Sequence, residues 1–257
     1  MRGICPLSSG SQGNVIYVGS GKTKLLFDVG LSFKKIQEKL AEIDLTIDDI
    51  DGIVISHEHS DHIKGLEQIA KSTTIPILCN GDTAKAICAE IDTRPNFKIF
   101  STGEPFVFGD ITITPFSIQH DTLDPCAFTL AFDGLKVGIC TDLGFASNLV
   151  AHHLQGCDYL YIEANHEEAM VHACARPLIY KKRVLGRQGH LSNKACAELI
   201  EKIHHDGLKH IYLAHLSSEC NDPDVALKTV GDHLGKLGLN TPLSIAFQDK
   251  ISKKIEF

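Results

Sequence analysis

The stretch that decides the fold is Ile53-Val54-Ile55-Ser56-His57-Glu58-His59-Ser60-Asp61-His62, an apolar segment that runs directly into the pattern HxHxDH. Alternate residues of an extended chain lie on the same side, so we expect His57 and His59 to share one face. Asp61 and His62 fall on the first turn of a following helix. Because a chance match to this pattern directly behind a strand is rare, the stretch predicts a metal-binding loop.

Imidazole nitrogens bind zinc, manganese and iron, and a carboxylate oxygen allows a second ion to lie close by. A site for two ions needs more ligands than this loop supplies. Further candidates follow later strands: His120 comes after 111–118, Asp142 ends 136–141, and His215 lies near the end of 211–216. We therefore expect these three residues to complete the site.

The length of 257 residues and the 43% hydrophobic content suit one globular domain over residues 1–257, without a linker, a repeat or a membrane-spanning segment. Short strands alternate with helices, which predicts two sheets packed face to face with helices outside. We expect one hairpin of Ala127–Phe132 with Lys136–Thr141 around Asp133-Gly134, and a second that closes the chain, Leu243–Phe247 with Ile251–Phe257.

Helix signals agree with this alternation. Ser32 is expected to cap a helix through Ile43, Ser192 to begin a helix through about His204, and Asp222 to cap a helix that starts at Pro223.

The nine cysteines contain no CxxC pair, which indicates reduced thiols and a cytoplasmic protein. The net charge of -7 argues against a protein that binds nucleic acid by bulk electrostatics.

These residues together resemble the motifs of the metallo-β-lactamase superfamily. Asp28, in Leu26-Phe27-Asp28-Val29-Gly30, matches the first motif, a carboxylate that orients the histidine loop. The resemblance implies a four-layer αββα sandwich of mixed α/β class and two divalent metal ions, zinc, manganese or iron. It implies one ion held by His57, His59 and His120, a second held by Asp61, His62 and His215, and Asp142 as the bridging ligand.

A second constellation concerns the proton donor of the reaction. Gly189-His190-Leu191-Ser192-Asn193 places a histidine directly before a helix, and it resembles the Gly-His-Ser-Thr loop of ribonuclease Z. In that family the histidine, paired with a carboxylate, protonates the leaving oxygen of a phosphodiester. Glu163 matches the position of the carboxylate. The resemblance thus implies that His190 and Glu163 act in catalysis with Asp61 and Asp142, and the competing interpretation of His190 is a residue beside a helix cap without chemistry.

Basic residues lie beside this loop in an otherwise acidic chain. They are candidates to bind the phosphates that flank the scissile bond, together with the polar residues of the helix start. A solvated helix face is the competing interpretation. The candidates are Lys181, Lys182, Arg183, Arg187, Ser192 and Asn193.

Taken with Ser8-Ser9-Gly10-Ser11-Gln12-Gly13-Asn14 and Glu163-Ala164-Asn165-His166, the motifs look closest to the YycJ-like (WalJ or VicX) branch. Its members are implied to be 5′-to-3′ exonucleases that act on DNA ends. The short gaps between motifs leave no room for a ribonuclease Z arm or a β-CASP insertion. His166 lies beside Glu163, where it either lines the cleft or caps a strand.

Four other functions remain open at this level. A small-molecule phosphodiesterase, as in the phosphonate-pathway relatives, would cleave a cyclic or bis-aryl phosphate, and a ribonuclease would share the loop of His190. A thioester hydrolase shares HxHxDH but does not need His190 and Glu163. A regulatory metal-binding protein would show no turnover.

Overall fold

The computed structural model describes residues 1–257, and the chain forms two compact units. The first comprises Met1–Pro115, Thr122–Cys126 and Phe247–Phe257, and the second comprises Phe116–Asp121 and Ala127–Ala246. Each unit combines strands of a mixed sheet with helices, which confirms the mixed α/β class. The single domain expected from the sequence stays a prediction.

The sheet of the first unit has the strand order β14-β1-β2-β3-β4-β5-β6. Its pairs are antiparallel from β14 to β3 and parallel from β3 to β6. Strand β7 pairs antiparallel with β8, these two strands end the sheet order β13-β12-β11-β10-β9-β8-β7, and β8 runs from the first unit into the second. The strands are β1 (Gly3–Ser8), β2 (Val15–Gly19), β3 (Lys24–Phe27), β4 (Gly52–Val54), β5 (Ile77–Asn80), β6 (Phe97–Phe100), β7 (Phe106–Phe108), β8 (Ile111–Ser117) and β14 (Ile255–Glu256).

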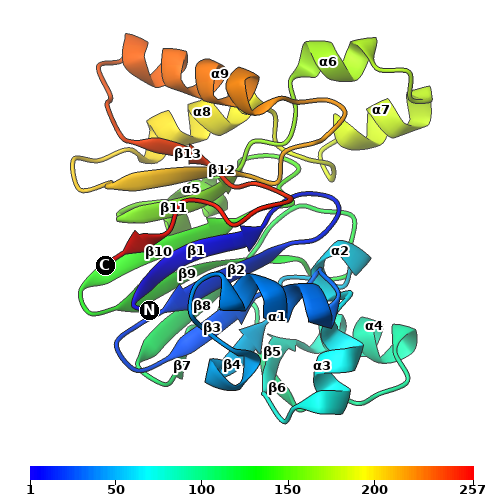
Figure 1. Ribbon diagram of the computed structural model, residues 1–257. Helices are drawn as coiled ribbons and strands as arrows, with labels where there is room; N and C mark the ends of the chain where they lie inside the picture. The colour runs from blue at the N-terminus through cyan, green and yellow to red at the C-terminus, as the bar shows by residue number, and fades with distance from the viewer. The chain divides into compact units, whose positions relative to one another are not determined.

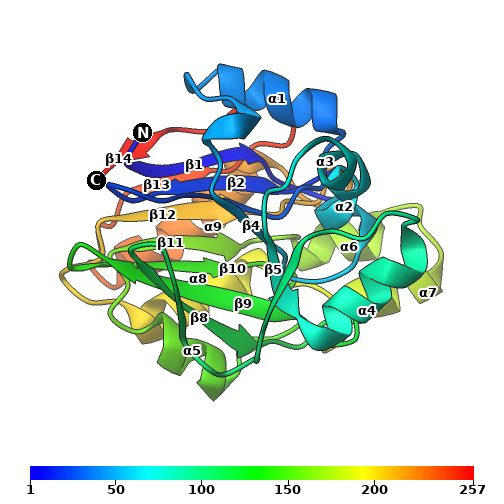
Figure 2. The same ribbon diagram turned by 90° about the horizontal axis from the view of Figure 1, so that it is seen from below.

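The helices of the first unit bury apolar faces in a shared core. Ile36 and Leu40 of α1, and Leu66 and Ile69 of α3, are all buried. Figure 2 shows α1 lying along β1 and β2. The helices are α1 (Phe33–Ala41), α2 (Ser60–Ile63), α3 (Leu66–Ser72), α4 (Gly81–Glu90) and the 3-10 helix η1 (Ile47–Asp49).

The sheet of the second unit contains the strand order β13-β12-β11-β10-β9. Strand β9 pairs antiparallel with β10, and the pairs from β10 to β13 are parallel. The predicted hairpin is confirmed: Phe132 pairs with Leu135, and Asp133 and Gly134 have positive φ angles of 51° and 74°. The strands are β9 (Cys126–Phe132), β10 (Leu135–Cys140), β11 (Tyr159–Glu163), β12 (His210–Ala214) and β13 (Leu243–Ile245).

In the second unit, α8 and α9 lie side by side next to β12 and β13 (Figure 1). Ser192 and Asp222 cap these two helices, as predicted, and Ser32 caps α1. No helix of the structure has both the length and the apolar character needed to cross a bilayer. The helices are α5 (Asn148–Leu154), α6 (Glu168–Ala173), α7 (Leu178–Val184), α8 (Asn193–Ile203) and α9 (Pro223–Lys236).

The predicted hairpin at the end of the chain is wrong. Strand β13 pairs in parallel with β12 in the second unit, whereas β14 pairs antiparallel with β1 in the first. Both segments have strand-like patterns, but each completes its backbone hydrogen bonds on the edge of a different sheet, and a local pattern does not specify such distant partners. Strand β4 ends at Val54, and just beyond it the carboxylate of Asp28 accepts the amide of Ser56 at 2.8 Å.

Candidate metal centre

In the first unit, the predicted ligands follow the carboxyl ends of two parallel neighbours. Asp28 follows β3, and His57 and His59 follow β4. Because parallel strands end at the same edge of a sheet, the topology alone brings these residues together. Asp61 and His62 lie in α2, the first turn after the loop.

Asp28 contacts two residues of this histidine loop. Its Oδ1 accepts the amide of Ser56 at 2.8 Å, and its Oδ2 accepts Nδ1 of His62 at 2.8 Å. The Oγ atom of Ser56 also lies 2.9 Å from Oδ2 of Asp28 and 2.9 Å from Nδ1 of His57. A proton on Nδ1 of His62 leaves the lone pair on Nε2, which is the form of imidazole that binds a metal.

Distances within the loop fit the ligands of metal ions. Nε2 of His57 lies 3.2 Å from Nδ1 of His59, and Nε2 of His62 lies 3.5 Å from Oδ2 of Asp61. Two ligands about 2.1 Å from one tetrahedral ion are separated by roughly 3.4 Å. The loop therefore presents two ligand pairs, each at the separation that suits one ion.

Sequence reasoning assigned no role to three residues that shape this loop. The amide of Asn14 donates to the carbonyl of Asp61 at 2.8 Å, and the Nδ2 atom of Asn14 lies 3.1 Å from Nε2 of His62. The hydroxyl of Ser56 contacts both Asp28 and His57. At Gly30 a Cβ atom would lie 1.6 Å from the carbonyl oxygen of Asp61, so no other residue fits there. The sequence could have pointed to two of these residues, because Gly30 belongs to the Asp28 motif and Asn14 to a Gly- and Ser-rich turn.

In the second unit, Asp142, Glu163 and His215 follow or end three adjacent parallel strands, β10, β11 and β12. Asp142 and His215 have positive φ angles of 56° and 54°, and Asp28 in the first unit has 58°. This conformation is unfavourable for a residue with a Cβ atom. Asp142, Glu163, His190 and His215 form a group whose candidate ligand atoms all lie within 4.8 Å of one another.

Glu163 is the centre of this group and is fully buried. Its Oε1 accepts Nδ1 of His190 at 2.8 Å and Nδ1 of His215 at 3.0 Å, while its Oε2 accepts the amides of Leu143 at 2.7 Å and Leu191 at 3.0 Å. Burial alone would raise the pKa of Glu163, but the charge of His190 and the hydrogen bonds from both histidines outweigh it and lower the pKa to about 2. Both carboxylate oxygens are thus occupied by protein donors, so Glu163 orients the two imidazoles and does not serve as a metal ligand.

His120 is buried in the second unit and directs one ring nitrogen to a backbone carbonyl. Its Nδ1 donates to the carbonyl of Gly189 at 3.1 Å, and its Nε2 lies 3.6 Å from Oδ1 of Asp142. Burial lowers the pKa of His120, although Asp142 acts in the opposite direction. The imidazole is thereby kept in the neutral form that binds a metal.

The predicted basic residues lie on and after α7, and most have partners within the second unit. Lys181 donates to the carbonyl of His172 at 2.6 Å, and the Nε atom of Arg183 donates to Oδ2 of Asp121 at 2.6 Å. The guanidinium of Arg187 lies 4.1 Å from the ring centre of Phe145. Lys182 is exposed.

The two polar candidates at the start of α8 have structural contacts. The hydroxyl of Ser192 accepts the amide of Ala195. Asn193 is fully buried and exchanges hydrogen bonds of 3.0 and 2.9 Å with Asn221. We therefore correct the assignment of Asn193 to phosphate binding, because its amide is committed to the core.

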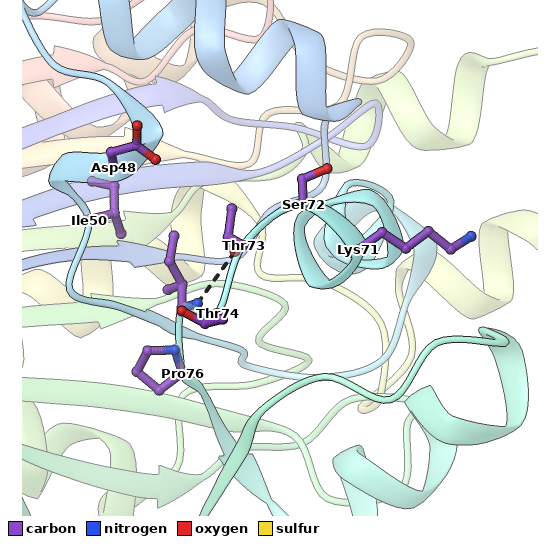
Figure 3. A pocket seen from close by; sticks show the side chains of 8 residues that line it. Asp48, Ile50, Lys71, Ser72, Thr73, Thr74 and Pro76 are labelled. Carbon is purple, nitrogen blue, oxygen red and sulfur yellow. Dashed lines mark hydrogen bonds between the residues drawn. The ribbon is translucent and has the colours of Figure 1, made fainter.

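A depression of about 610 Å³ on the first unit lies among Asp48, Ile50 and the end of α3 (Figure 3). None of the predicted site residues lines it. Lys71 is paired with Glu67 at 2.6 Å. With a single acidic side chain and no histidine, this depression lacks a metal-ligand set.

The chain matches the β-lactamase superfamily domain over residues 23–215. It belongs to this superfamily. It is 35% identical over 257 residues to the exodeoxyribonuclease YycJ of Bacillus anthracis, with 98% of this chain and 97% of the relative covered. It is also 35% identical to the exodeoxyribonuclease WalJ of Streptococcus pneumoniae serotype 2, with 95% and 92% covered. The family predicted from HxHxDH and Asp28 is thus confirmed.

Solved structures agree on the fold. The metallo-β-lactamase fold protein YhfI of Bacillus subtilis gives a TM-score of 0.71 at 17% identity and covers 96% of this chain and 97% of its own. A diphosphatase from the PhnP family gives 0.68 at 15% identity and covers 100% and 99%. Human tRNase Z, short form, gives 0.60 at 18% identity and covers 84% and 93%. These likenesses confirm the predicted fold family.

Proposed function

We propose that the protein is a dinuclear-metal-dependent phosphodiester hydrolase that degrades DNA from the 5′ end. The observation that carries the proposal is the pair of buried Glu163 and partly buried His190, which lies beside Asp142 and His215 in the second unit. A hydrolase that binds metal needs no such pair for water activation, but it does need a proton donor when the leaving group is an alkoxide. The similarity to two proteins named exodeoxyribonucleases supports DNA as the substrate.

The metal ligands follow the order of the family's motifs along the chain. In this assignment one ion would be held by His57, His59 and His120 and the other by Asp61, His62 and His215, with Asp142 as a shared ligand. It is supported by the ligand separations of 3.2 and 3.5 Å in the loop and by the carboxylates that hold Nδ1 of His62 and His215. When bound, two divalent cations supply a water of lowered pKa and neutralise charge on the phosphoryl oxygens.

Side chains of the second unit then orient the attacking water and supply the proton for the leaving oxygen. Asp142 orients the attacking water, whose oxygen forms a bond to phosphorus while the bond to the leaving oxygen breaks. His190 gives its proton to that leaving oxygen. The anionic carboxylate of Glu163 holds Nδ1 of His190, which both stabilises the charged imidazole and fixes the ring. A positioned acid of this kind contributes about 10²- to 10⁴-fold in rate.

We expect basic residues of α7 to form a path that binds the phosphates of the DNA backbone. Among them Lys182 is exposed and Arg183 is paired with Asp121. Such a path would contribute a salt-dependent affinity for the phosphate backbone in an acidic protein. Neutralising Lys182 should therefore weaken DNA binding and reduce its dependence on salt, with little effect on a small phosphodiester.

The decisive experiment combines metal analysis with DNA duplexes labelled at the 5′ or the 3′ end. Wild type should contain two divalent ions and release labelled mononucleotide first from the 5′-labelled duplex. The Asp61→Ala variant should lose metal and activity. The His190→Ala variant should keep its metal and turn over about 10²- to 10⁴-fold more slowly.

A matched control is His233→Ala, because this partly exposed histidine of α9 is paired with Glu201 at 2.7 Å and belongs to none of the predicted groups. It should leave metal content and rate unchanged. Nuclease activity in metal-free Asp61→Ala would overturn the mechanism. Hydrolysis of bis(p-nitrophenyl) phosphate without cleavage of DNA would overturn the substrate and favour a small-molecule phosphodiesterase, and cleavage of RNA in place of DNA would favour a ribonuclease.

A further inference from the structure

A pocket of about 310 Å³ adjoins His190 within the second unit. Its lining includes Phe145, His166, Leu191 and Ser192. This volume lies at the small end of the range of about 300 to 1,000 Å³ that ligand pockets span. The pocket therefore suits one compact group that is held next to the proposed proton donor.

His166 gives this pocket a polar group without a partner in the protein. The residue is 2% exposed, and its Nδ1 makes no hydrogen bond. A buried ring nitrogen in this state is unfavourable unless a ligand supplies the missing contact. Burial lowers the pKa of His166 to about 4, so the imidazole is neutral near pH 7 and has one donor and one acceptor nitrogen.

The lining lacks the lysine or arginine that an anion site commonly uses. It does include the exposed carboxylate of Glu168. A phosphate group placed here would meet the carboxylate of Glu168, and the cationic group of the lining, His190, is assigned to the leaving oxygen. A neutral, largely apolar group with polar edges does fit these surroundings.

Phe145 supplies an aromatic wall. Its ring carries the guanidinium of Arg187 at 4.1 Å, a contact that restrains the ring. Leu185 and Leu191 add apolar surface on the same lining. His172 and His190 also line the pocket. An aromatic ring, apolar neighbours and the neutral imidazole of His166 can hold a flat nucleobase, because every base has a π face and polar edges.

We propose that this pocket binds the nucleobase of the terminal nucleotide, the one whose oxygen leaves with the proton from His190. The proposal rests on the proposed function. Phe145 contacts the base, and His166 hydrogen bonds to its edge. Because a neutral imidazole offers a donor or an acceptor according to its tautomer, the pocket accepts any of the bases and requires that a base be present.

The test compares DNA duplexes with a normal 5′-terminal nucleotide and with an abasic one, for wild type and for Phe145→Ala. Wild type should cleave the normal end with a KM about tenfold lower than the abasic end. In Phe145→Ala that preference should shrink toward none, through a higher KM for the normal end and little change for the abasic end.

The matched control is Phe247→Ala. Phe247 carries Lys250 at 4.1 Å from its ring centre, the same arrangement as Phe145, but it lies in the first unit and does not line the pocket. This variant should keep the preference of wild type. As a readout apart from turnover, calorimetry should show about tenfold tighter binding of thymidine 5′-monophosphate than of deoxyribose 5-phosphate, and His166→Ala should reduce that difference.

The outcomes separate the two proposals. If wild type degrades DNA but uses normal and abasic ends equally, the base pocket is wrong and the nuclease assignment stands. If Phe145→Ala and Phe247→Ala change the preference alike, the pocket is also wrong. If wild type binds thymidine 5′-monophosphate in preference to deoxyribose 5-phosphate but cleaves no DNA, the base pocket is supported and the proposed function is overturned.

Discussion

Replacing Glu163 with Gln changes one atom in the most constrained carboxylate of the second unit. Its Oε1 faces two imidazole N–H groups, and its Oε2 faces two backbone N–H groups. An amide has one acceptor oxygen and one NH₂ group. If the NH₂ group faces the backbone amides, two hydrogen bonds are lost. If it faces the imidazoles, their hydrogen bonds survive only where a ring moves its proton from Nδ1 to Nε2.

The magnitude follows from these contacts. A hydrogen bond to a charged group contributes about 1.5 to 3 kcal/mol, and breaking a buried charged pair costs about 3 to 5 kcal/mol. We therefore expect Glu163→Gln to lower the free energy of unfolding of the metal-free protein by about 3 to 5 kcal/mol. If NH₂ faces the imidazoles, His215 moves its proton to Nε2, which also weakens metal binding.

The assay is urea denaturation of the metal-free protein near pH 7, together with metal content and turnover after metal is restored. Glu198→Gln is the matched control, because Glu198 lies on α8 with its side chain 55% exposed and pairs with Lys194 at 3.8 Å. It should change stability by less than about 0.5 kcal/mol. A loss below about 1 kcal/mol in Glu163→Gln, with metal retained, would refute the reasoning.

Three further outcomes are expected. Ser56→Ala removes the hydroxyl that contacts Asp28 and should weaken metal affinity about 10- to 100-fold, measured by competition with a chelator. Asn193→Ala should destabilise the protein by about 1 to 3 kcal/mol in urea without changing the salt dependence of DNA binding, since its amide is buried. His166 has its pKa lowered from 6.5 to about 4, so the unfolded chain binds its proton first as the pH falls; wild type should lose about 1.4 kcal/mol per pH unit between 6.5 and 4 relative to His166→Asn, compared by urea denaturation across that range.

The residues of the first unit's site were the easiest to predict. HxHxDH lies in one short stretch, and the Asp28 motif precedes it on a neighbouring strand. Local spacing is enough to place such ligands, because strand, loop and first helical turn follow one another directly. The contribution of Ser56 was not visible, since a serine within a polar loop gives no signal until the fold brings Asp28 beside it.

Features that depend on distant pairing could not be read from local patterns. The strand β1 and the helix α4 were not predicted, and the two final strands join different sheets. The positive φ of His215 was equally hidden, because positive φ is uncommon for every residue except glycine and residue type alone does not predict it. Such strain is maintained by surrounding contacts, among them the bond from Asn165 to the carbonyl of His215 at 2.8 Å.

The two units use the same physical device at different points of the chain. In the first, Asp28 accepts Nδ1 of His62 and a backbone amide, and in the second, Glu163 accepts Nδ1 of His215 and two backbone amides. Each carboxylate is buried and accepts hydrogen bonds from several donors, which favours the tautomer of the histidine with its proton on Nδ1. The sequence suggested Glu163 as a partner of His190 alone. Because one of its oxygens holds both histidines, the orientation of a proposed ligand and that of the proposed proton donor are coupled, and neither can be altered through Glu163 without the other.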